Sequence, residues 1–206
     1  MRARETNRTR AYLDLREQRE QAADCRRCEL WRNATQTVFG EGPVPAELML
    51  VGEQPGDAED LAGRPFVGPA GRILDQALEF AGLDREQVYV TNTVKHFKFE
   101  ERHKRRIHQK PDAGEIAACN HWLEAELADV APTVLIALGA TAARALIGAR
   151  FRVTRQHGEF VPSELAPFVT ATLHPAAILR MRTPSERTAA QRGFERDIAR
   201  AAAMLR

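Results

Sequence analysis

The chain has 206 residues, of which 44% are hydrophobic and 28% are charged. This length suits one domain and is too short for two of ordinary size, and the composition excludes a disordered or fibrous protein. The formal net charge of +2 gives no indication of nucleic-acid binding by itself. The apolar stretches fall short of the roughly 18 residues needed to cross a bilayer. The basic N-terminus has no apolar h-region after it, so we expect a cytoplasmic protein without a membrane partner.

Short apolar runs alternate with helical patterns along most of the chain. Buried strands are predicted at 47–51, 87–92, 133–139 and 167–175. A polar helix is predicted over 1–24, and further helices at 68–82, from 112, at 141–147 and from 183. Because the strands are apolar and alternate with helices, we predict an α/β fold with three layers, α/β/α, around a mainly parallel, four-stranded central sheet.

We expect a single domain over residues 1–206 with two specialised segments. One is a metal-ligand segment near residues 20–30, and the other is a basic inserted loop near residues 97–111. Seven Lys or Arg residues lie between Lys95 and Lys110, against Glu100 and Glu101. Such a local excess on a nearly neutral protein is typical of a phosphate contact, although a solvated surface loop is the alternative.

Polar clusters follow three of the predicted strands. They are Gly-Glu-Gln-Pro-Gly at 52–56, Asn92 with Lys95 and His96, and His174 with Pro175. Ligands of parallel α/β sheets bind at the carboxyl ends of the strands, so we expect these clusters to meet in one crevice. The loops contain neither a Walker motif nor a dinucleotide fingerprint. Phe66, in a Gly- and Pro-rich loop, is either a core residue or a ring on which a base stacks.

Taken in order, the motifs resemble a known family. GEQPG (52–56), GRPFVGPAGR (63–72), VYVTNTVKH (88–96) and HP (174–175) resemble the family 4 uracil-DNA glycosylases. The insert KRRIH (104–108) resembles the UdgX class of that family, which cross-links to uracil-containing DNA. The resemblance implies a base-excision repair enzyme that cleaves the N-glycosidic bond of uracil. It also implies that the protein stays bonded to the abasic deoxyribose through His108, in a single turnover.

The resemblance also implies roles for individual residues. The catalytic set is Glu53, His108 and His174. The substrate-binding set is Gly52, Gln54, Asp57, Phe66 and Asn92, and the DNA-binding set is Lys104, Arg105 and Arg106. Elementary chemistry supports several of these roles. An asparagine amide can donate to uracil O4 and accept from N3–H, a histidine near O2 stabilises the departing anion, and a neutral imidazole beside a glutamate can attack C1′.

The three cysteines predict a metal site rather than disulfides, since their number is odd and two form a Cys-x-x-Cys pair. The resemblance implies a [4Fe–4S] cluster of structural role. Its ligands are expected to be Cys25, Cys28, His96 and Cys119, with histidine where the family has a cysteine. The same set suits structural zinc, and a labile cluster without His96 is a third alternative.

Two other functions compete with covalent capture. One is a non-catalytic module that binds uracil-containing DNA tightly. The other is a conventional glycosylase with multiple turnovers, in which KRRIH only binds phosphate. The presence of His108 within the insert favours capture. We expect uracil-containing DNA, preferably single-stranded, as the partner of a monomeric protein.

Overall fold

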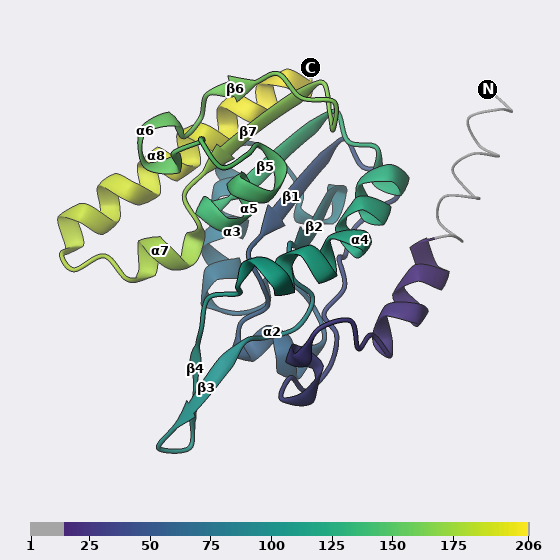
Figure 1. The fold of residues 1–206 in the computed structure, drawn as a ribbon. Helices are drawn as coiled ribbons and strands as arrows, with labels where there is room; N and C mark the ends of the chain where they lie inside the picture. Colours follow the sequence, from purple (N-terminus) through teal and green to yellow (C-terminus); the bar gives the residue numbers. More distant parts are fainter. Residues whose placement is uncertain (1–14, 206) are drawn as a thin grey trace, which may run out of the picture.

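The computed structural model describes residues 15–205, and its centre is a five-stranded sheet in the order β2–β1–β5–β7–β6 (Figure 1). The strands are β1 (Leu48–Gly52), β2 (Val88–Asn92), β5 (Val134–Leu138), β6 (Phe160–Val161) and β7 (Phe168–Thr172). The four predicted strands pair in parallel, which confirms the predicted fold class. The antiparallel β6 adds an edge strand that is too short to have a detectable hydrophobic period.

Helices cover both faces of the sheet. They are α2 (Asp57–Ala62), α3 (Pro69–Phe80), α4 (Ala113–Val130), α5 (Gly139–Leu146), α6 (Val153–Gln156), α7 (Pro175–Leu179) and α8 (Pro184–Ala202), with 3-10 turns η1 (Glu29–Arg32), η2 (Arg85–Gln87) and η3 (Ala203–Leu205). Of the polar helix predicted over 1–24, residues 15–23 are helical, and 1–14 lie outside the described residues. In the part of the chain that is described, no helix has both the length and the apolar character needed to span a membrane.

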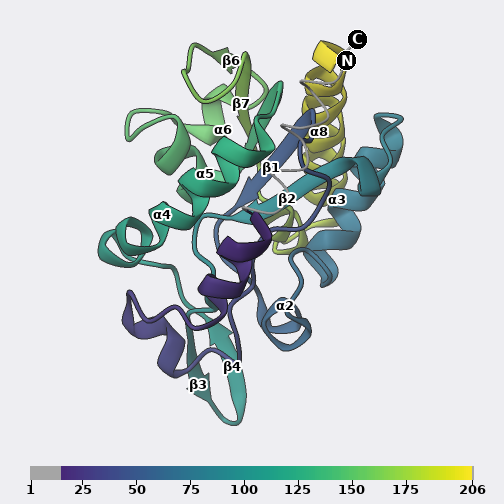
Figure 2. The ribbon, with the colours of Figure 1, turned by 90° about the vertical axis from the view of Figure 1, so that its right-hand side faces the viewer.

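The central strands are buried on both sides because their residues alternate between two cores. Leu48 and Leu50 of β1 pack with the inner faces of α3 and α8. Met49 and Val51 point the other way and pack with α4 and α5. Figures 1 and 2 show these helices on opposite sides of the sheet. The layering confirms the expected α/β/α arrangement.

The topology places a ligand site between two central strands. The chain runs from β1 outward to β2 on one side, and then returns to β5 on the other side of β1. The loops after β1 and β5 therefore diverge and leave a crevice at the carboxyl end of the sheet. Glu53 begins the loop after β1, and α5 begins directly after β5.

The basic segment predicted as a loop is a β-hairpin that projects from the body of the protein (Figures 1 and 2). Its strands are β3 (Phe99–Arg102) and β4 (Arg105–His108), paired antiparallel. The connecting residues His103 and Lys104 both have positive φ, at 49° and 62°, as a tight hairpin turn requires. The hairpin carries His108 at the end of β4, beside the sheet.

A buried ion pair joins α4 to the end of β2. Lys95 Nζ lies 2.5 Å from Glu126 Oε2, and both side chains are almost fully buried. Lys95 Nζ also donates to Thr91 Oγ1 and to the carbonyl oxygen of Asn92. Glu126 accepts further hydrogen bonds from the backbone N–H of Gly40 and the hydroxyl of Tyr89. Each charge therefore has several partners, as a buried charge needs.

Replacing Glu126 with glutamine should strongly destabilise the fold. The variant keeps the shape of the side chain but leaves the Lys95 ammonium buried without a counter-charge, which costs about 3–5 kcal/mol. Urea unfolding followed by circular dichroism measures the change. Arg16→Ala, which breaks an exposed pair with Glu20, is the control and should change the unfolding free energy little. An equally small loss for Glu126→Gln would contradict the importance of the pair.

Candidate active site

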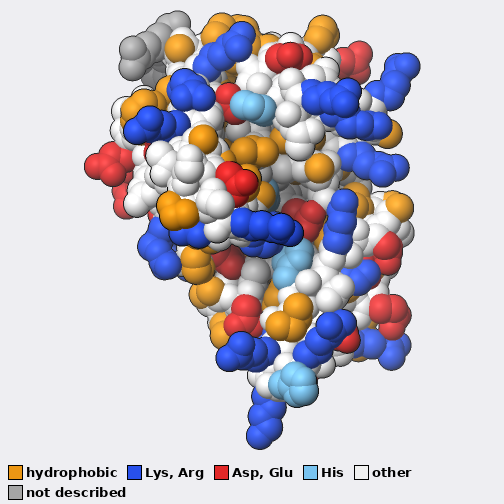
Figure 3. All heavy atoms as spheres, turned by 90° about the vertical axis from the view of Figure 1, so that its left-hand side faces the viewer, with side chains coloured by type: hydrophobic (Ala, Val, Ile, Leu, Met, Phe, Trp, Pro, Cys, Tyr) orange, Lys and Arg blue, Asp and Glu red, His pale blue; other side chains and the backbone are white. Residues whose placement is uncertain are grey.

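The polar clusters at the strand ends do meet in one crevice. A cavity of about 570 Å³ lies at the carboxyl end of the sheet, and Figure 3 shows a hollow on this face with Lys and Arg side chains around it. Strand-end residues from β1, β2, β5 and β7 line the cavity, namely Glu53, Asn92, Thr141 and His174. The predicted convergence is thus confirmed for the 52–56 loop, Asn92 and His174. It is wrong for Lys95 and His96, which lie against Glu126 and Thr37 outside the cavity lining.

Asn92 presents an unused acceptor to this cavity. The residue is the last of β2 and only 2% exposed. Its Oδ1 is buried and has no hydrogen-bond partner within residues 15–205, whereas its backbone carbonyl is held by Lys95. Buried polar atoms in proteins are rarely left unpaired. The unpaired oxygen therefore suits a ligand that supplies an N–H donor.

Phe66 forms a wall of the cavity in an unusual backbone conformation. Its φ is +56°, a region that bulky residues rarely adopt and that is most often found at functional sites. The ring lies 6.1 Å from that of His174, with 27° between the planes. A Cβ at Gly52 would overlap Asn92 Oδ1 and the Phe66 ring, and one at Gly71 would overlap the Phe66 carbonyl. The two glycines therefore allow the ring and the amide to approach.

Glu59, which we did not predict, ties two loops of the cavity together. Its Oε1 accepts from the backbone N–H of Gly68 at 2.8 Å, and its Oε2 accepts from that of Gly56 at 3.1 Å. The loop after β1 and the loop that carries Phe66 are thereby held in one arrangement.

His174 is set up as a neutral hydrogen-bond donor. Its Nδ1 accepts from the backbone N–H of Ala176 at 3.1 Å and caps α7, so the ring proton is on Nε2. Burial, reinforced by the positive charge of Arg180, lowers the pKa of His174 to about 4. The imidazole is therefore neutral at physiological pH and can donate from Nε2 to a ligand.

His108 and Glu53 face each other across the cavity mouth. His108 Nε2 lies 3.4 Å from Glu53 Oε1, and the other carboxylate oxygen accepts a hydrogen bond from the Thr141 hydroxyl. Burial lowers the pKa of His108, Glu53 raises it, and Arg180 lowers it further. Thr141 was missed in the sequence, although its place directly after an apolar strand is the signal that identified the other strand-end residues.

Gln54 lines the cavity and is also hydrogen-bonded to the hairpin. Its side-chain Nε2 donates to the carbonyl oxygens of Lys98 and Gln109, and its Oε1 accepts from the backbone N–H of Lys98. Gln54 was predicted to bind the substrate. Its amide also fastens the base of the hairpin, because both flanks of the hairpin bring backbone groups within its reach, and its role in substrate binding stays a prediction.

Arg106 and Asp57 also have partners that the sequence did not reveal. Arg106 pairs with Asp57 at 2.5 Å and with the fully buried Asp60 at 2.6 Å, and its guanidinium lies against the rings of Phe97 and Phe99. Both charges therefore help to dock the hairpin on α2, and the roles of Arg106 in DNA binding and of Asp57 in substrate binding stay predictions.

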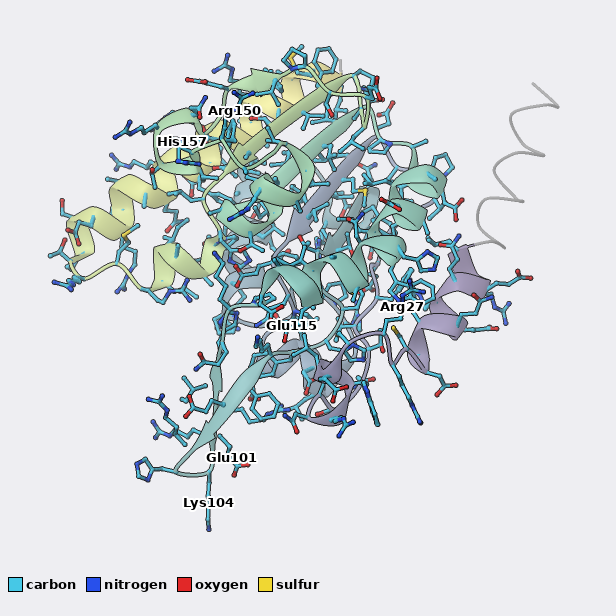
Figure 4. All side chains as sticks on the ribbon, in the orientation of Figure 1. Arg27, Glu101, Lys104, Glu115, Arg150 and His157 are labelled. Atoms are coloured by element: carbon cyan, nitrogen blue, oxygen red, sulfur yellow. The ribbon has the colours of Figure 1, made fainter. Side chains whose placement is uncertain are left out.

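Lys104 and Arg105, at the hairpin tip, are exposed and make no ion pair within residues 15–205. Lys104 points outward at the end of the hairpin (Figure 4). These two predicted DNA-binding residues therefore remain accessible.

The predicted metal ligands lie in three segments close to α4. The backbone N–H of Lys95 donates to Cys119 Sγ at 3.2 Å, and Trp122 Nε1 donates to Cys25 Sγ at 3.3 Å. Burial raises the pKa of Cys119 to about 11, and the nearby Cys25 and Cys28 contribute to the rise. Within the described residues, no three Cys, His, Asp or Glu side chains form a closed group that could hold a metal ion.

His96 is oriented by a hydroxyl. Its Nε2 lies 2.9 Å from Thr37 Oγ1, and Thr37 gives its own proton to the carbonyl oxygen of Ala22. The imidazole must therefore donate from Nε2, which leaves the lone pair of Nδ1 free. A histidine that ligates a metal usually donates its other N–H in this way, so His96 by itself has the orientation of a ligand, whereas the four predicted ligands form no closed group within the described residues.

The fold and the cavity together define an α/β protein with a polar cavity at the carboxyl end of its parallel sheet. The family model of the uracil DNA glycosylase superfamily matches residues 39–198, and the chain belongs to this superfamily. The resemblance inferred from the motifs is thus confirmed at the level of the superfamily.

Individual relatives agree with this assignment. The chain is 38% identical to a Type-4 uracil-DNA glycosylase of Thermotoga maritima over 80% of its length and 82% of that protein. It is 34% identical to a Type-4 uracil-DNA glycosylase of Pyrobaculum aerophilum, over 91% of this chain and 92% of that protein. A Type-5 uracil-DNA glycosylase of the same organism is 31% identical, over 74% of this chain and 71% of that protein.

The titration of His108 should respond in opposite directions to its two charged neighbours. Glu53→Gln removes the anion that favours the imidazolium, so the pKa of His108 should fall. Arg180→Gln removes a repelling cation, so the pKa values of His108 and His174 should rise. Titration of the ring protons by NMR measures both shifts. Arg16→Gln, on the distant helix 15–23, is the control, and shifts of the same sign in both test variants would contradict the electrostatics.

Proposed function

We propose that this protein excises uracil from DNA by cleaving its N-glycosidic bond. The observation that carries the proposal is the buried Oδ1 of Asn92 in the cavity, which has no hydrogen-bond partner in the described part of the chain. This oxygen suits the N3–H of uracil, and the amide group of the same side chain suits O4. Cytosine has an acceptor at N3 and a donor at position 4, so it would leave both groups mismatched.

The cavity also suits the charge that develops during cleavage. When the bond between C1′ and uracil N1 breaks, the electron pair leaves with the base, and an oxocarbenium-like sugar remains. The Nε2–H of His174 can donate to the O2 side of the base and stabilise its negative charge. The neutral imidazole of His174 provides this N–H donor without placing a positive charge near the reaction. Phe66 provides the surface on which the base stacks.

We further propose that the protein belongs to the UdgX class and captures its product. In this step a lone pair of the His108 ring attacks C1′ and forms an N–C bond, while the proton on the other ring nitrogen passes towards Glu53. The uracil anion leaves, so one bond forms and one breaks. The lowered pKa of His108 supports the step, because only the neutral ring is nucleophilic.

Thr141 supports the role proposed for Glu53. The threonine hydroxyl occupies one carboxylate oxygen, so the other stays directed at His108. Gln54 and Arg106 contribute indirectly, since they hold the hairpin that carries His108 against the body of the protein. A conventional turnover glycosylase remains the second candidate, because the same cavity can release its product to water if His108 does not react.

His108→Ser should convert the protein from capture to turnover. Without the imidazole, water is the remaining nucleophile, and the abasic product is released. Incubation with uracil-containing single-stranded DNA, followed by denaturing electrophoresis and a parallel assay of free uracil, measures both outcomes. The unmodified protein should give a gel-stable adduct with about one uracil released per chain, and the variant should release many without an adduct.

The controls for this assay separate the three functions. His103→Ser removes another histidine of the same hairpin and should leave the adduct unchanged. Uracil release without any adduct in the unmodified protein would indicate a turnover enzyme, and absence of release would indicate passive binding. A persistent adduct in His108→Ser would overturn the assignment of the nucleophile.

DNA is proposed to reach the cavity as a single strand bound by a monomer. The exposed Lys104 and Arg105 at the hairpin tip are suited to contact the phosphates next to the uracil. The uracil must be flipped out or unpaired, whether the DNA is double- or single-stranded, because a base that is stacked in a duplex cannot enter a cavity below the protein surface.

A [4Fe–4S] cluster held by Cys25, Cys28, Cys119 and His96 is proposed as a structural cofactor. The N–H groups directed at two of the sulfurs suit thiolate ligands, and the free Nδ1 of His96 suits the fourth position. When bound, the cluster supplies a rigid link between the segment after helix 15–23, α4 and the end of β2. The protein residues in the cavity carry the proposed chemistry.

His96→Ala should weaken retention of this cluster. The holoprotein is expected to contain about four iron and four sulfide atoms per chain and to be coloured, and the variant should lose iron during purification. His103→Ser, which removes an exposed histidine at the hairpin tip, is the control and should keep full iron. Metal analysis and visible absorbance measure the difference. A colourless holoprotein with one zinc ion would overturn the assignment, as would equal iron in the two variants.

A further inference from the structure

A second group of cations borders the cavity, apart from the hairpin. Between Asp129 and Glu159 the sequence contains no acidic residue but four arginines, and all four are exposed. They are Arg144, Arg150, Arg152 and Arg155, on α5, on α6 and on the loop between them. We call this group the α5–α6 rim.

The rim lies at the mouth of the cavity. Thr141 of α5 and Val153 and Thr154 of α6 line the cavity itself. Thr154 is exposed and stands between Arg152 and Arg155 in the chain. Figure 4 places Arg150 beside α6, away from the hairpin tip, and Figure 3 shows basic side chains around the hollow. The cavity is therefore bordered by the hairpin on one side and by the rim on another.

The guanidinium groups of the rim make no ion pair within residues 15–205. Within residues 15–205, the guanidinium groups of Arg144, Arg150 and Arg155 make no ion pair or hydrogen bond, and Arg152 donates only to the nearby carbonyls of Ala149 and Phe151. Arg106 of the hairpin differs, since two aspartates neutralise it. A group of like charges without counter-ions repels itself, so a bound polyanion would relieve the repulsion.

We propose that the α5–α6 rim is a second phosphate-binding surface for the DNA strand, on the other side of the cavity from the hairpin tip. This inference rests on the proposed function, because it assigns the path of the same substrate. A nucleotide inserted into the cavity has a backbone that leaves in two directions, and each direction carries phosphates. Lys104 and Arg105 meet the strand on one side, and Arg150 and Arg155 meet it on the other.

The double variant Arg150→Gln/Arg155→Gln tests the rim. Its equilibrium binding to a uracil-free, single-stranded oligonucleotide is measured over a range of salt concentrations, so that no covalent product interferes. Each lost phosphate contact lowers the salt slope by about 0.7, so the double variant should lose about 1.4 in slope and about 25-fold in affinity at roughly 0.1 M salt. Because neither side chain has an ion-pair or hydrogen-bond partner within residues 15–205, the variant should fold normally.

Arg16→Gln is the control for a general change of charge. Arg16 is exposed, on helix 15–23 on the opposite side of the molecule from α6 (Figure 1), and its removal should leave the salt slope nearly unchanged.

The results separate this inference from the proposed function. An unchanged salt slope in the double variant, or an equal loss in Arg16→Gln, overturns the rim as a DNA contact even if uracil is released normally. Absence of uracil release from the unmodified protein overturns the proposed function. A reduced slope in that case still identifies the rim as a surface that binds single-stranded DNA.

Discussion

Lys95 joins three parts of the molecule through its ammonium group and its backbone N–H. It pairs with Glu126 of α4 and donates to the carbonyl of Asn92, the residue whose side chain faces the cavity. The backbone N–H of Lys95 donates to Cys119. A buried charge must keep its partners close, because the loss of one partner leaves the desolvation free energy of the charge uncompensated. Cys119 and Glu126 of α4 and the end of β2 at the cavity are therefore coupled through one residue.

The hairpin depends on the same principle of paired charge. A two-stranded hairpin is only marginally stable alone, and this one projects from the body of the protein. Arg106, held between two aspartates of α2 and two phenylalanine rings, docks it, and Gln54 closes its base. The position of His108 beside Glu53 follows from this docking. Arg106 thus positions His108, while Lys104 and Arg105 at the hairpin tip stay exposed to solvent.

The electrostatics of the cavity suit a departing anion. Burial and the positive charge of Arg180 lower the pKa of both His108 and His174, so each ring is neutral at physiological pH. A neutral ring can donate a hydrogen bond or offer a lone pair, whereas an imidazolium can only donate. Arg180 contributes positive potential without occupying the place of the base. These properties are consistent with the roles proposed for the two histidines.

The sequence by itself determined the layers of the fold and the place of the site. Hydrophobic period identifies buried strands, and parallel strands bring the residues at their carboxyl ends together, so Glu53, Asn92 and His174 could be assigned to one crevice. Only the tertiary structure decided which partners the polar side chains take. Arg106 meets an aspartate 46 positions away, and Thr141 meets a glutamate 88 positions away. Such pairings depend on how loops pack in space, and no periodic pattern in the sequence predicts that packing.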